Sequence, residues 1–230
     1  AQMKLLAKQP LLFEPGSDYV YGLGLDLLGY LIEVISGKPL DQFFAEEIFT
    51  PLNMQDSHFY LPKAKVDRLV TLYAEMDQVG LTVARGNESN INLDNPRYPA
   101  GDGQSYFSGG AGVSSTAYDY ARFIQMLLNK GTLEGSRILS RKSVELMQSA
   151  RVDSDGDQIP DFGLGFEIIV DPAKAGELGS AGTYSWSGAY LTSYWIDPKE
   201  NLIAVFLSQV RPSQSDIRAK FNTIVYQALE

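Results

Sequence analysis

Residues 191–209, LTSYWIDPKENLIAVFLSQ, carry the pattern that decides the fold class. Its two ends, 191–196 and 202–209, are rich in β-branched and aromatic residues, and a proline-containing segment from Asp197 to Asn201 separates them. Two such runs on either side of a short turn predict an antiparallel β-hairpin.

Helical periodicity appears on both sides of this hairpin. Apolar residues recur at helical spacing over 25–35, and Gly37 followed by Pro39 marks the end of that helix. A terminal helix is expected to begin at Ser213 or Ser215 and to run to about residue 229. Further helices are expected over 2–8, 41–49, 116–128 and 142–147, and a further strand over 166–170.

The order of these elements predicts an α+β fold, in which an antiparallel sheet is flanked by helices and accompanied by a helical lobe. Thr116 and Asp119 form a capping-box-like pair, with Asp in place of Glu, and Ser140 is expected to cap the helix that follows it. Residues 55–106 hold several Pro, Asn and Gly, and are expected to form an irregular insertion with short strands. We expect one domain over residues 1–230.

The composition excludes several functional classes. A hydrophobic content of 44% over 230 residues supports a sizeable core. The net charge of −9, without a basic stripe, argues against a nucleic-acid partner. No apolar run approaches the ~20 residues of a membrane span, and the absence of Cys excludes disulfides and thiolate metal sites. The compartment stays open: periplasmic, secreted or cytoplasmic.

The common nucleophile motifs are missing from the sequence. It contains no Gly-x-Ser-x-Gly, and no Ser is followed three residues later by Lys. His58 is the only histidine, and we interpret it as structural. A single histidine also argues against a catalytic zinc site.

Several short motifs nevertheless follow one another in an order that resembles a known superfamily. They are Tyr21-Gly22-Leu23 before the first long helix, ISGKP at 35–39, FTPLNM at 49–54, GGAGVSST at 109–116, and Ser185-Trp186-Ser187-Gly188-Ala189. This series is similar to the serine β-lactamase/penicillin-binding-protein superfamily, and in particular to its class C-related esterase branch. The resemblance spans residues 10–209 and implies a β-lactamase/transpeptidase-like fold.

The resemblance implies roles for these residues. Tyr21 would transfer protons between the nucleophilic serine and the leaving group, and because a tyrosine pKa is ordinarily ~10 it needs a cation nearby. Trp186, Ser187 and Gly188 match the Trp-x-Gly form of the family's third motif and would form the substrate-side wall. The backbone N–H of Ala189 would supply half of the oxyanion hole. No cofactor is implied for catalysis.

In family order, the Ser-x-x-Lys motif lies upstream of residue 10. The resemblance therefore implies that this chain is the C-terminal two-thirds of one domain, a partial fold that is inactive alone. We expect its partner to be the missing N-terminal segment or a swapped copy, because the absent strands would leave a sheet edge open.

Two departures from the family pattern bear on the substrate. Leu23 stands where β-lactamases have Asn, and Trp186 stands where they have a Lys that helps to hold a carboxylate. Both favour a neutral carboxylic ester. A β-lactamase, a D,D-carboxypeptidase and a D-aminopeptidase remain alternatives, as does a non-catalytic binding module or fragment.

A second candidate site lies in DSDGDQIPD, residues 153–161. Asp153, Asp155, Asp157 and Asp161 have a spacing that suits oxygen ligation of Ca²⁺ and resembles thrombospondin-type calcium loops. It differs from an EF-hand, because the twelfth position is Leu164. We expect a structural Ca²⁺ site, and a solvated acidic turn is the alternative.

Overall fold

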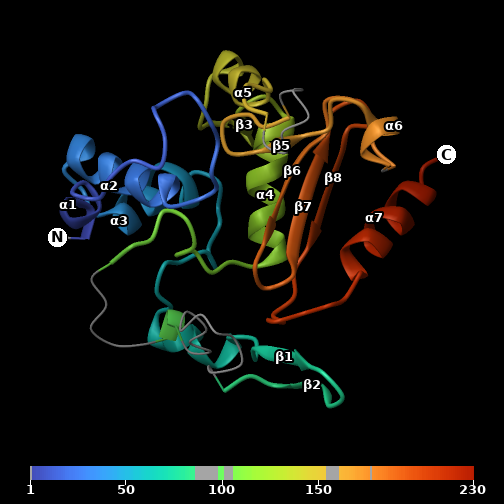
Figure 1. Ribbon diagram of the computed structural model, residues 1–230, viewed down its shortest axis with the longest axis horizontal. Coiled ribbons are helices and arrows are strands. Elements are labelled where there is room, and N and C mark those ends of the chain that lie inside the picture. Colours follow the sequence, from blue (N-terminus) through green and yellow to red (C-terminus); the bar gives the residue numbers. More distant parts are fainter. Residues whose placement is uncertain (1, 86–97, 101–105, 154–160, 177) are drawn as a thin grey trace.

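The computed structural model describes residues 2–85, 98–100, 106–153, 161–176 and 178–230. Within these ranges a four-stranded antiparallel sheet lies between helices, beside an N-terminal group of helices and a separate two-stranded hairpin (Figure 1). This combination is the α+β class expected from the order of the sequence patterns. Within the same ranges, no helix is both long enough and apolar enough to cross a bilayer.

The α-helices are α1 (Gln2–Leu6), α2 (Gly24–Ser36), α3 (Leu40–Phe44), α4 (Ala117–Leu128), α5 (Arg141–Met147), α6 (Pro172–Ala175) and α7 (Ile217–Gln227). A π-helical turn, η1 (Ala45–Phe49), and two 3₁₀ segments, η2 (Lys63–Arg68) and η3 (Tyr98–Ala100), accompany them. The strands are β1 (Tyr73–Met76), β2 (Gly80–Val83), β3 (Thr132–Leu133), β4 (Ser136–Arg137), β5 (Glu167–Ile168), β6 (Tyr184–Gly188), β7 (Thr192–Asp197) and β8 (Leu202–Phe206).

The main sheet has the strand order β5-β6-β7-β8. Strands β7 and β8 form the hairpin predicted from the sequence, and Asp197 pairs with Leu202 beside the turn. The strand expected over 166–170 is shorter than predicted, because only Glu167–Ile168 pair with β6. The sequence does not predict β6, whose YSWSG segment lacks a run of β-branched residues.

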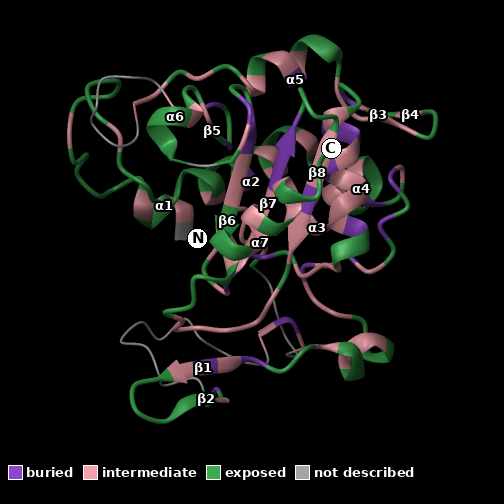
Figure 2. Cartoon of the chain, turned by 90° about the vertical axis from the view of Figure 1, so that its right-hand side faces the viewer, coloured by how far each residue is buried: buried purple, intermediate pink, exposed green. Residues whose placement is uncertain are grey.

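Alternate residues of β7 face opposite layers of helix. Ile196 is buried in the cluster that includes Ile124 of α4. On the other face, the indole of Trp195 meets the rings of Phe221 and Tyr226 from α7, at centroid distances of 5.5 and 6.1 Å. The second half of β7 is buried, and Figure 2 shows this strand in the middle of the molecule. The sheet is therefore clamped between α4 and α7, and its strands have little freedom to shift.

The N-terminal lobe follows the sequence prediction closely. Helix α2 ends at Gly37, which has a left-handed φ of 69° and donates a backbone hydrogen bond of 3.0 Å to Glu33. The helix expected over 41–49 is present, but it changes form: α3 continues into the π-helical turn η1. Gly29 of α2 is buried, and a Cβ there would lie 2.9 Å from the Leu40 side chain.

The insertion at 55–106 is irregular in its described part, as expected, and holds the β1–β2 hairpin and the η2 turn. Backbone hydrogen bonds attach it to the segment between β8 and α7: Tyr73 donates to Gln209, and Arg211 donates to Tyr73, each at 2.8 Å. Glu75 also accepts hydrogen bonds from the Ser213 hydroxyl and the Gln214 backbone N–H. The hairpin therefore supports the segment that leads into α7.

The helix caps agree with the sequence predictions in two places and differ from them in two. The Thr116 hydroxyl accepts from the backbone N–H of Asp119, and the Ser140 hydroxyl accepts from that of Ser143. The reciprocal half of the capping box is absent among the described hydrogen bonds, because the buried Asp119 carboxylate accepts instead from residues 56 and 57. The prediction that Ser213 or Ser215 begins the last helix is wrong by a few residues, since α7 follows Asp216.

Candidate active site

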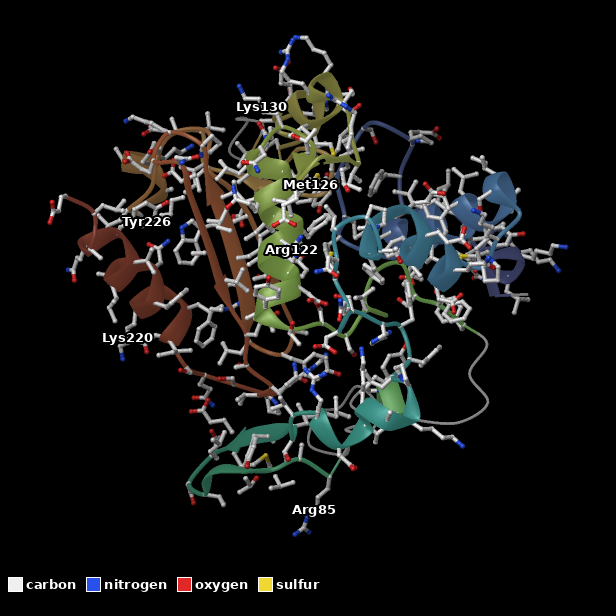
Figure 3. The ribbon with its side chains drawn as sticks, turned by 180° about the vertical axis from the view of Figure 1, so that it is seen from behind. Arg85, Arg122, Met126, Lys130, Lys220 and Tyr226 are labelled. Atoms are coloured by element: carbon white, nitrogen blue, oxygen red, sulfur yellow. The ribbon has the colours of Figure 1, made fainter. Side chains whose placement is uncertain are left out.

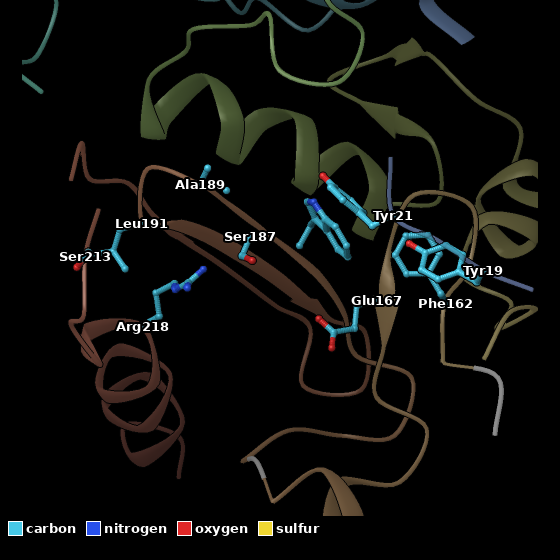
Figure 4. Close-up of a pocket in the computed structure, with 11 residues that line it drawn as sticks. Tyr19, Tyr21, Phe162, Glu167, Ser187, Ala189, Leu191, Ser213 and Arg218 are labelled. Atoms are coloured by element: carbon cyan, nitrogen blue, oxygen red, sulfur yellow. The ribbon is translucent and has the colours of Figure 1, made fainter. Parts of the chain in front are cut away.

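A cavity of about 620 Å³ lies at the edge of the sheet where β6 ends. It collects residues from the segment before α2, from β5 and β6, from the β6–β7 turn and from the start of α7 (Figure 4). The lining residues are Tyr19, Tyr21, Phe162, Glu167, Trp186, Ser187, Gly188, Ala189, Leu191, Ser213 and Arg218. The five residues that the sequence assigned to catalysis and to the substrate wall therefore line one cavity.

Four aromatic rings form one wall of this cavity. Tyr21 stacks on Trp186 with ring centroids 5.9 Å apart and an interplanar angle of 27°. The Phe162 ring contacts Trp186 edge-on, with ring centroids 5.2 Å apart. The Tyr19 ring lies next to Phe162, with ring centroids 5.7 Å apart. Offset rings at such distances attract each other beyond their buried area. The wall holds Tyr21 in place, although its side chain is 66% exposed.

The position of Trp186 follows from how β6 is paired. Strand β6 pairs with β7 along its whole length, so that Trp186 lies opposite Tyr194 and Gly188 opposite Thr192. On its other side only the first half of β6 has a partner, through Ser185 and β5. Within the described residues the second half therefore presents an open edge to the cavity, which is where an extended group could lie against it.

Gly188 and Ala189 end this edge. A Cβ at Gly188 would lie 2.3 Å from the hydroxyl oxygen of Thr192, so any other residue here would have to displace the Thr192 side chain or the strand. The turn closes through Leu191, which has φ 61° and donates to the Gly188 carbonyl at 3.2 Å. Among the described residues the backbone N–H of Ala189 has no acceptor. It is free to donate to a ligand oxygen.

The cavity has opposite charges in different places. Glu167 comes from β5 and Arg218 from the first turn of α7, and Ser187 lies between them in Figure 4. Burial raises the pKa of Tyr19 above its ordinary value, and the neighbouring Tyr21 and Asp161 raise it further. Tyr19 is therefore a neutral phenol at physiological pH and contributes no charge to the aromatic wall.

The single histidine lies outside this cavity. The backbone of His58 pairs with that of Ser114 through hydrogen bonds of 2.9 and 2.8 Å. Its Nε2 lies 3.1 Å from the Lys65 ammonium. Burial and the charge of Lys65 lower the His58 pKa, so the ring stays neutral. His58 therefore lies where the 55–106 insertion joins the rest of the fold.

The structure describes only part of the candidate calcium loop. Asp155 and Asp157 lie outside the described residues. Val152 and Phe162 form an isolated bridge, which brings the neighbouring Asp153 and Asp161 to the base of the loop. Within the described ranges there is no group of three residues arranged to hold a metal ion. The calcium site therefore remains a prediction.

The glycine motif at 109–112 serves helix packing. A Cβ at Gly109 would lie 2.2 Å from the Leu25 carbonyl oxygen, so the loop runs directly against α2. Asp26 accepts hydrogen bonds of 2.7 and 2.6 Å from the hydroxyls of Tyr106 and Ser108. Burial and the Asp26 carboxylate raise the pKa of Tyr106 to about 12. This packing positions the start of α2, close in sequence to Tyr21.

Sequence reasoning missed several residues that line the cavity. Tyr19 carried a usable signal, because alternate residues of an extended segment point the same way and Tyr21 was already a candidate. Phe162 and Arg218 carried none, since only the tertiary fold brings them to β6. Glu167 was assigned to a strand, and nothing in the sequence showed that it borders the same cavity.

Comparison with known proteins places this geometry in context. The family model described as Beta-lactamase matches residues 2–227. The chain is 34% identical over 223 residues to protein Rv1367c of Mycobacterium tuberculosis. The aligned region covers 91% of this chain and 53% of that protein. It is 29% identical over 222 residues to esterase EstB of Burkholderia gladioli, covering 90% and 53%. The chain therefore spans about half the length of the curated relatives it matches.

A solved structure agrees with these matches. EstCE1, described as a hydrolase with promiscuous acyltransferase activity, superposes with a TM-score of 0.84 at 30% sequence identity. The superposition covers 97% of this chain and 60% of that chain. The similarity in backbone fold therefore extends over nearly the whole of this chain.

Proposed function

Because this chain belongs to the Beta-lactamase family, we propose that it carries the substrate-side part of a serine hydrolase that cleaves carboxylic esters through an acyl-enzyme. The observation that carries this proposal is the stack of Tyr21 on Trp186 in the cavity. It joins the family's tyrosine motif to its Trp-x-Gly motif at one sheet edge. The esterase EstB among the relatives supports an ester substrate.

Tyr21 takes the proton-transfer role in this proposal. As a serine oxygen attacks the ester carbonyl, its proton passes to the side-chain oxygen of Tyr21. Tyr21 then gives that proton to the departing alkoxide oxygen as the ester C–O bond breaks, so that a neutral alcohol leaves. Water repeats the same steps on the acyl-enzyme, and the carboxylic acid is released.

The nucleophile belongs to a part of the protein that this sequence does not include. The 230 residues contain no Ser-x-x-Lys motif, and the relatives are about twice as long as the matched region. Such a motif would bring both the serine and the lysine cation that a tyrosine base needs.

Two surfaces support the idea that a further segment packs on this chain. Helix α2 leaves Leu27, Leu28, Val34 and Ile35 between 50% and 77% exposed. Exposed apolar patches of this kind mark interaction sites. Strand β8 has only β7 as a neighbour in the described sheet. The remainder of the protein, or a swapped copy of it, would cover both surfaces.

The oxyanion formed during the attack needs hydrogen-bond donors. The unpaired N–H of Ala189 at the end of β6 can provide one of them. Loss of one such donor typically costs about 10²-fold to 10³-fold in rate. The aromatic wall around Trp186 favours an uncharged group beside the reacting ester.

The test is Tyr21→Phe in the full-length protein, with para-nitrophenyl butyrate as substrate. We expect kcat/KM to fall by at least about 100-fold, because the proton-transfer group is lost while the ring stack is kept. Tyr118→Phe is the matched control, since Tyr118 is an exposed tyrosine on α4 that does not line the cavity. Equal activity in both variants would contradict the role of Tyr21.

Parallel assays separate the alternatives within the family. A chromogenic cephalosporin tests β-lactamase activity, a peptide ending in D-alanyl-D-alanine tests carboxypeptidase activity, and a D-alanine anilide tests aminopeptidase activity. Turnover of none of these, and of no ester, would leave a binding module as the remaining function.

A further inference from the structure

One end of the aromatic wall carries negative charge. The exposed side chain of Glu167 lines the cavity there, and its backbone forms an isolated bridge with Phe162. The Tyr19 ring lies against Phe162, and the Asp161 carboxylate is close enough to Tyr19 to help raise the pKa of that phenol. Two carboxylates therefore accompany two rings. We call Tyr19, Phe162 and Glu167, with Asp161 nearby, the acidic end of the cavity.

The positive charge of the cavity lies at its other end. Among the lining residues that the structure describes, Arg218 is the single cation. Figure 4 shows it beyond Ser187, on the side away from Glu167 and from the rings of the acidic end. Lys220 of the same helix is directed outward (Figure 3), where it lies 2.9 Å from Asp216. The cations of α7 therefore leave the negative potential of the acidic end largely in place.

Carboxylates beside aromatic rings suit an organic cation. The face of an aromatic ring attracts a positive charge within about 6 Å of its centroid, and tryptophan does so most strongly. A quaternary ammonium group contacts rings through its methyl groups, and it needs no hydrogen-bond acceptor. A neighbouring carboxylate adds a coulombic attraction. Phe162 and Trp186 are half-buried, so both offer ring surface that is partly shielded from water. A neutral group of the same shape gains neither attraction.

We propose that the acidic end binds a quaternary ammonium group, so that the esters this site prefers carry a positive charge remote from the reacting carbonyl. The inference rests on the proposed function of the cavity as the acyl-transfer site. Glu167 pairs with Ser185, four residues before Ala189. At the rise of a β-strand this places the two ends of the site about 13 Å apart. An uncharged linker then lies beside Trp186, and the sequence expectation of a neutral substrate is revised at the far end of the molecule.

The experiment compares two pairs of esters on the full-length protein. The members of each pair have the same shape, because a neutral tert-butyl group replaces the trimethylammonium group. The first pair, para-nitrophenyl 6-(trimethylammonio)hexanoate and para-nitrophenyl 7,7-dimethyloctanoate, carries the difference in the acyl part. The second pair, butyrylcholine and 3,3-dimethylbutyl butyrate, carries it in the alcohol part. The pair that responds shows which part of the substrate reaches the acidic end.

The quantity measured is the ratio of kcat/KM for the cationic ester to kcat/KM for its neutral partner. We expect this ratio to be about 10 for one pair in the wild type. Glu167→Gln should lower it by about 3-fold to 10-fold, because the carboxylate is lost while the length of the side chain is kept. Phe162→Leu should lower it by about 3-fold, because an apolar side chain without a ring remains.

The matched control is Glu200→Gln. Glu200 is an exposed carboxylate in the turn between β7 and β8 and does not line the cavity, so its loss changes the net charge equally. The ratio should stay at the wild-type value in this variant. Thermal melting checks the folding of all three variants. A ratio near one for both pairs in the wild type would overturn the proposal. It would also be overturned by an unchanged ratio in a folded Glu167→Gln or Phe162→Leu variant, or by an equal fall in Glu200→Gln.

A binding measurement separates this inference from the proposed function. If the wild-type protein hydrolyses no ester, calorimetry still reads the site with two matched pairs of amides and alcohols. These are 6-(trimethylammonio)hexanamide against 7,7-dimethyloctanamide, and choline against 3,3-dimethylbutan-1-ol. Preference for either cation that is lost in Glu167→Gln and kept in Glu200→Gln would support the proposal without catalysis. No preference in the wild-type protein would overturn it, even if neutral esters are hydrolysed.

Discussion

The phenol ring of Tyr21 lies against the indole of Trp186, with ring centroids 5.9 Å apart. The first residue belongs to the segment before α2 and the second to β6, so the contact joins the helical lobe to the sheet. Phe162 contacts the same indole at 5.2 Å and supports it from another side. The orientation of the proposed proton-transfer group thus depends on a ring that takes no part in the proton transfer.

Replacing Trp186 should therefore affect catalysis through Tyr21. Trp186→Ala removes the stack and should lower kcat/KM for para-nitrophenyl butyrate by about 10-fold, since an aromatic pair contributes about 0.5–1.5 kcal/mol beyond its buried area. Trp186→Phe keeps a ring at this position and should retain most of the activity. Steady-state kinetics on the full-length protein, with thermal melting as a check on folding, measures both. Equal activity of the Ala variant and the wild type would show that the stack does not position Tyr21.

Gly188 offers a test of the sheet edge. In Gly188→Ala the new methyl group would meet the Thr192 hydroxyl at 2.3 Å, so the Thr192 side chain or the β6–β7 pairing must shift. We expect a loss of about 1–3 kcal/mol in the free energy of unfolding, as is typical of overpacking. Thr192→Ala removes the opposing oxygen, so the double variant should recover much of the loss in a denaturant titration. Additive losses in the double variant would contradict this explanation.

The sequence predicts the parts of the fold that local signals control. Gly37 ends α2 as expected, and the turn after Asp197 joins β7 to β8. The superfamily resemblance was also correct, because five weak motifs in the expected order reflect a shared fold. Strand β6 escaped prediction because its pairing with β7, and not its own composition, makes it a strand.

The cavity could be predicted only in part. Tyr21 and the residues from Trp186 to Ala189 were found through the family pattern, and the structure brings them together. Arg218 could not be found, because its position depends on how α7 packs against the sheet. Asp119 was assigned to a local cap, whereas the fold uses its carboxylate to bind a loop far away in the sequence.

Gly109 provides a test of the packing beneath Tyr21. Gly109→Ala would place a methyl group 2.2 Å from the Leu25 carbonyl oxygen, which is part of the helix backbone and cannot turn aside. We expect a loss of about 3 kcal/mol in the free energy of unfolding. Gly24→Ala is the matched control: a Cβ there meets nothing within 4 Å, so the change should be neutral or stabilising by up to about 1 kcal/mol. Similar melting temperatures for both variants would show that α2 and the glycine loop are not in tight contact.

The acid sensitivity of the fold should depend on Asp56. Arg68 donates two hydrogen bonds to its carboxylate, at 2.6 and 2.8 Å, and Lys65 lies 2.9 Å away. These two cations hold the Asp56 pKa well below its ordinary value. The folded protein therefore binds the Asp56 proton more weakly than the unfolded chain does. The resulting stabilisation is fully present above the unfolded pKa of about 3.9 and is lost as the pH falls through the lower folded value.

Denaturant unfolding of the wild type and of Asp56→Asn between pH 7 and pH 2 tests this linkage. The variant should be less stable at pH 7 and pH 5. The difference should shrink steadily below about pH 4, where Asp56 of the unfolded wild-type chain begins to take up a proton that the folded protein still binds weakly. The stability difference between the wild type and Arg68→Gln should depend on pH in the same way, because Arg68 is the main cause of the lowered Asp56 pKa. High salt should also reduce the difference at pH 7, since these groups are partly exposed. A difference that stays constant down to pH 2 would show that the stabilisation comes from packing around residue 56 and not from its charge.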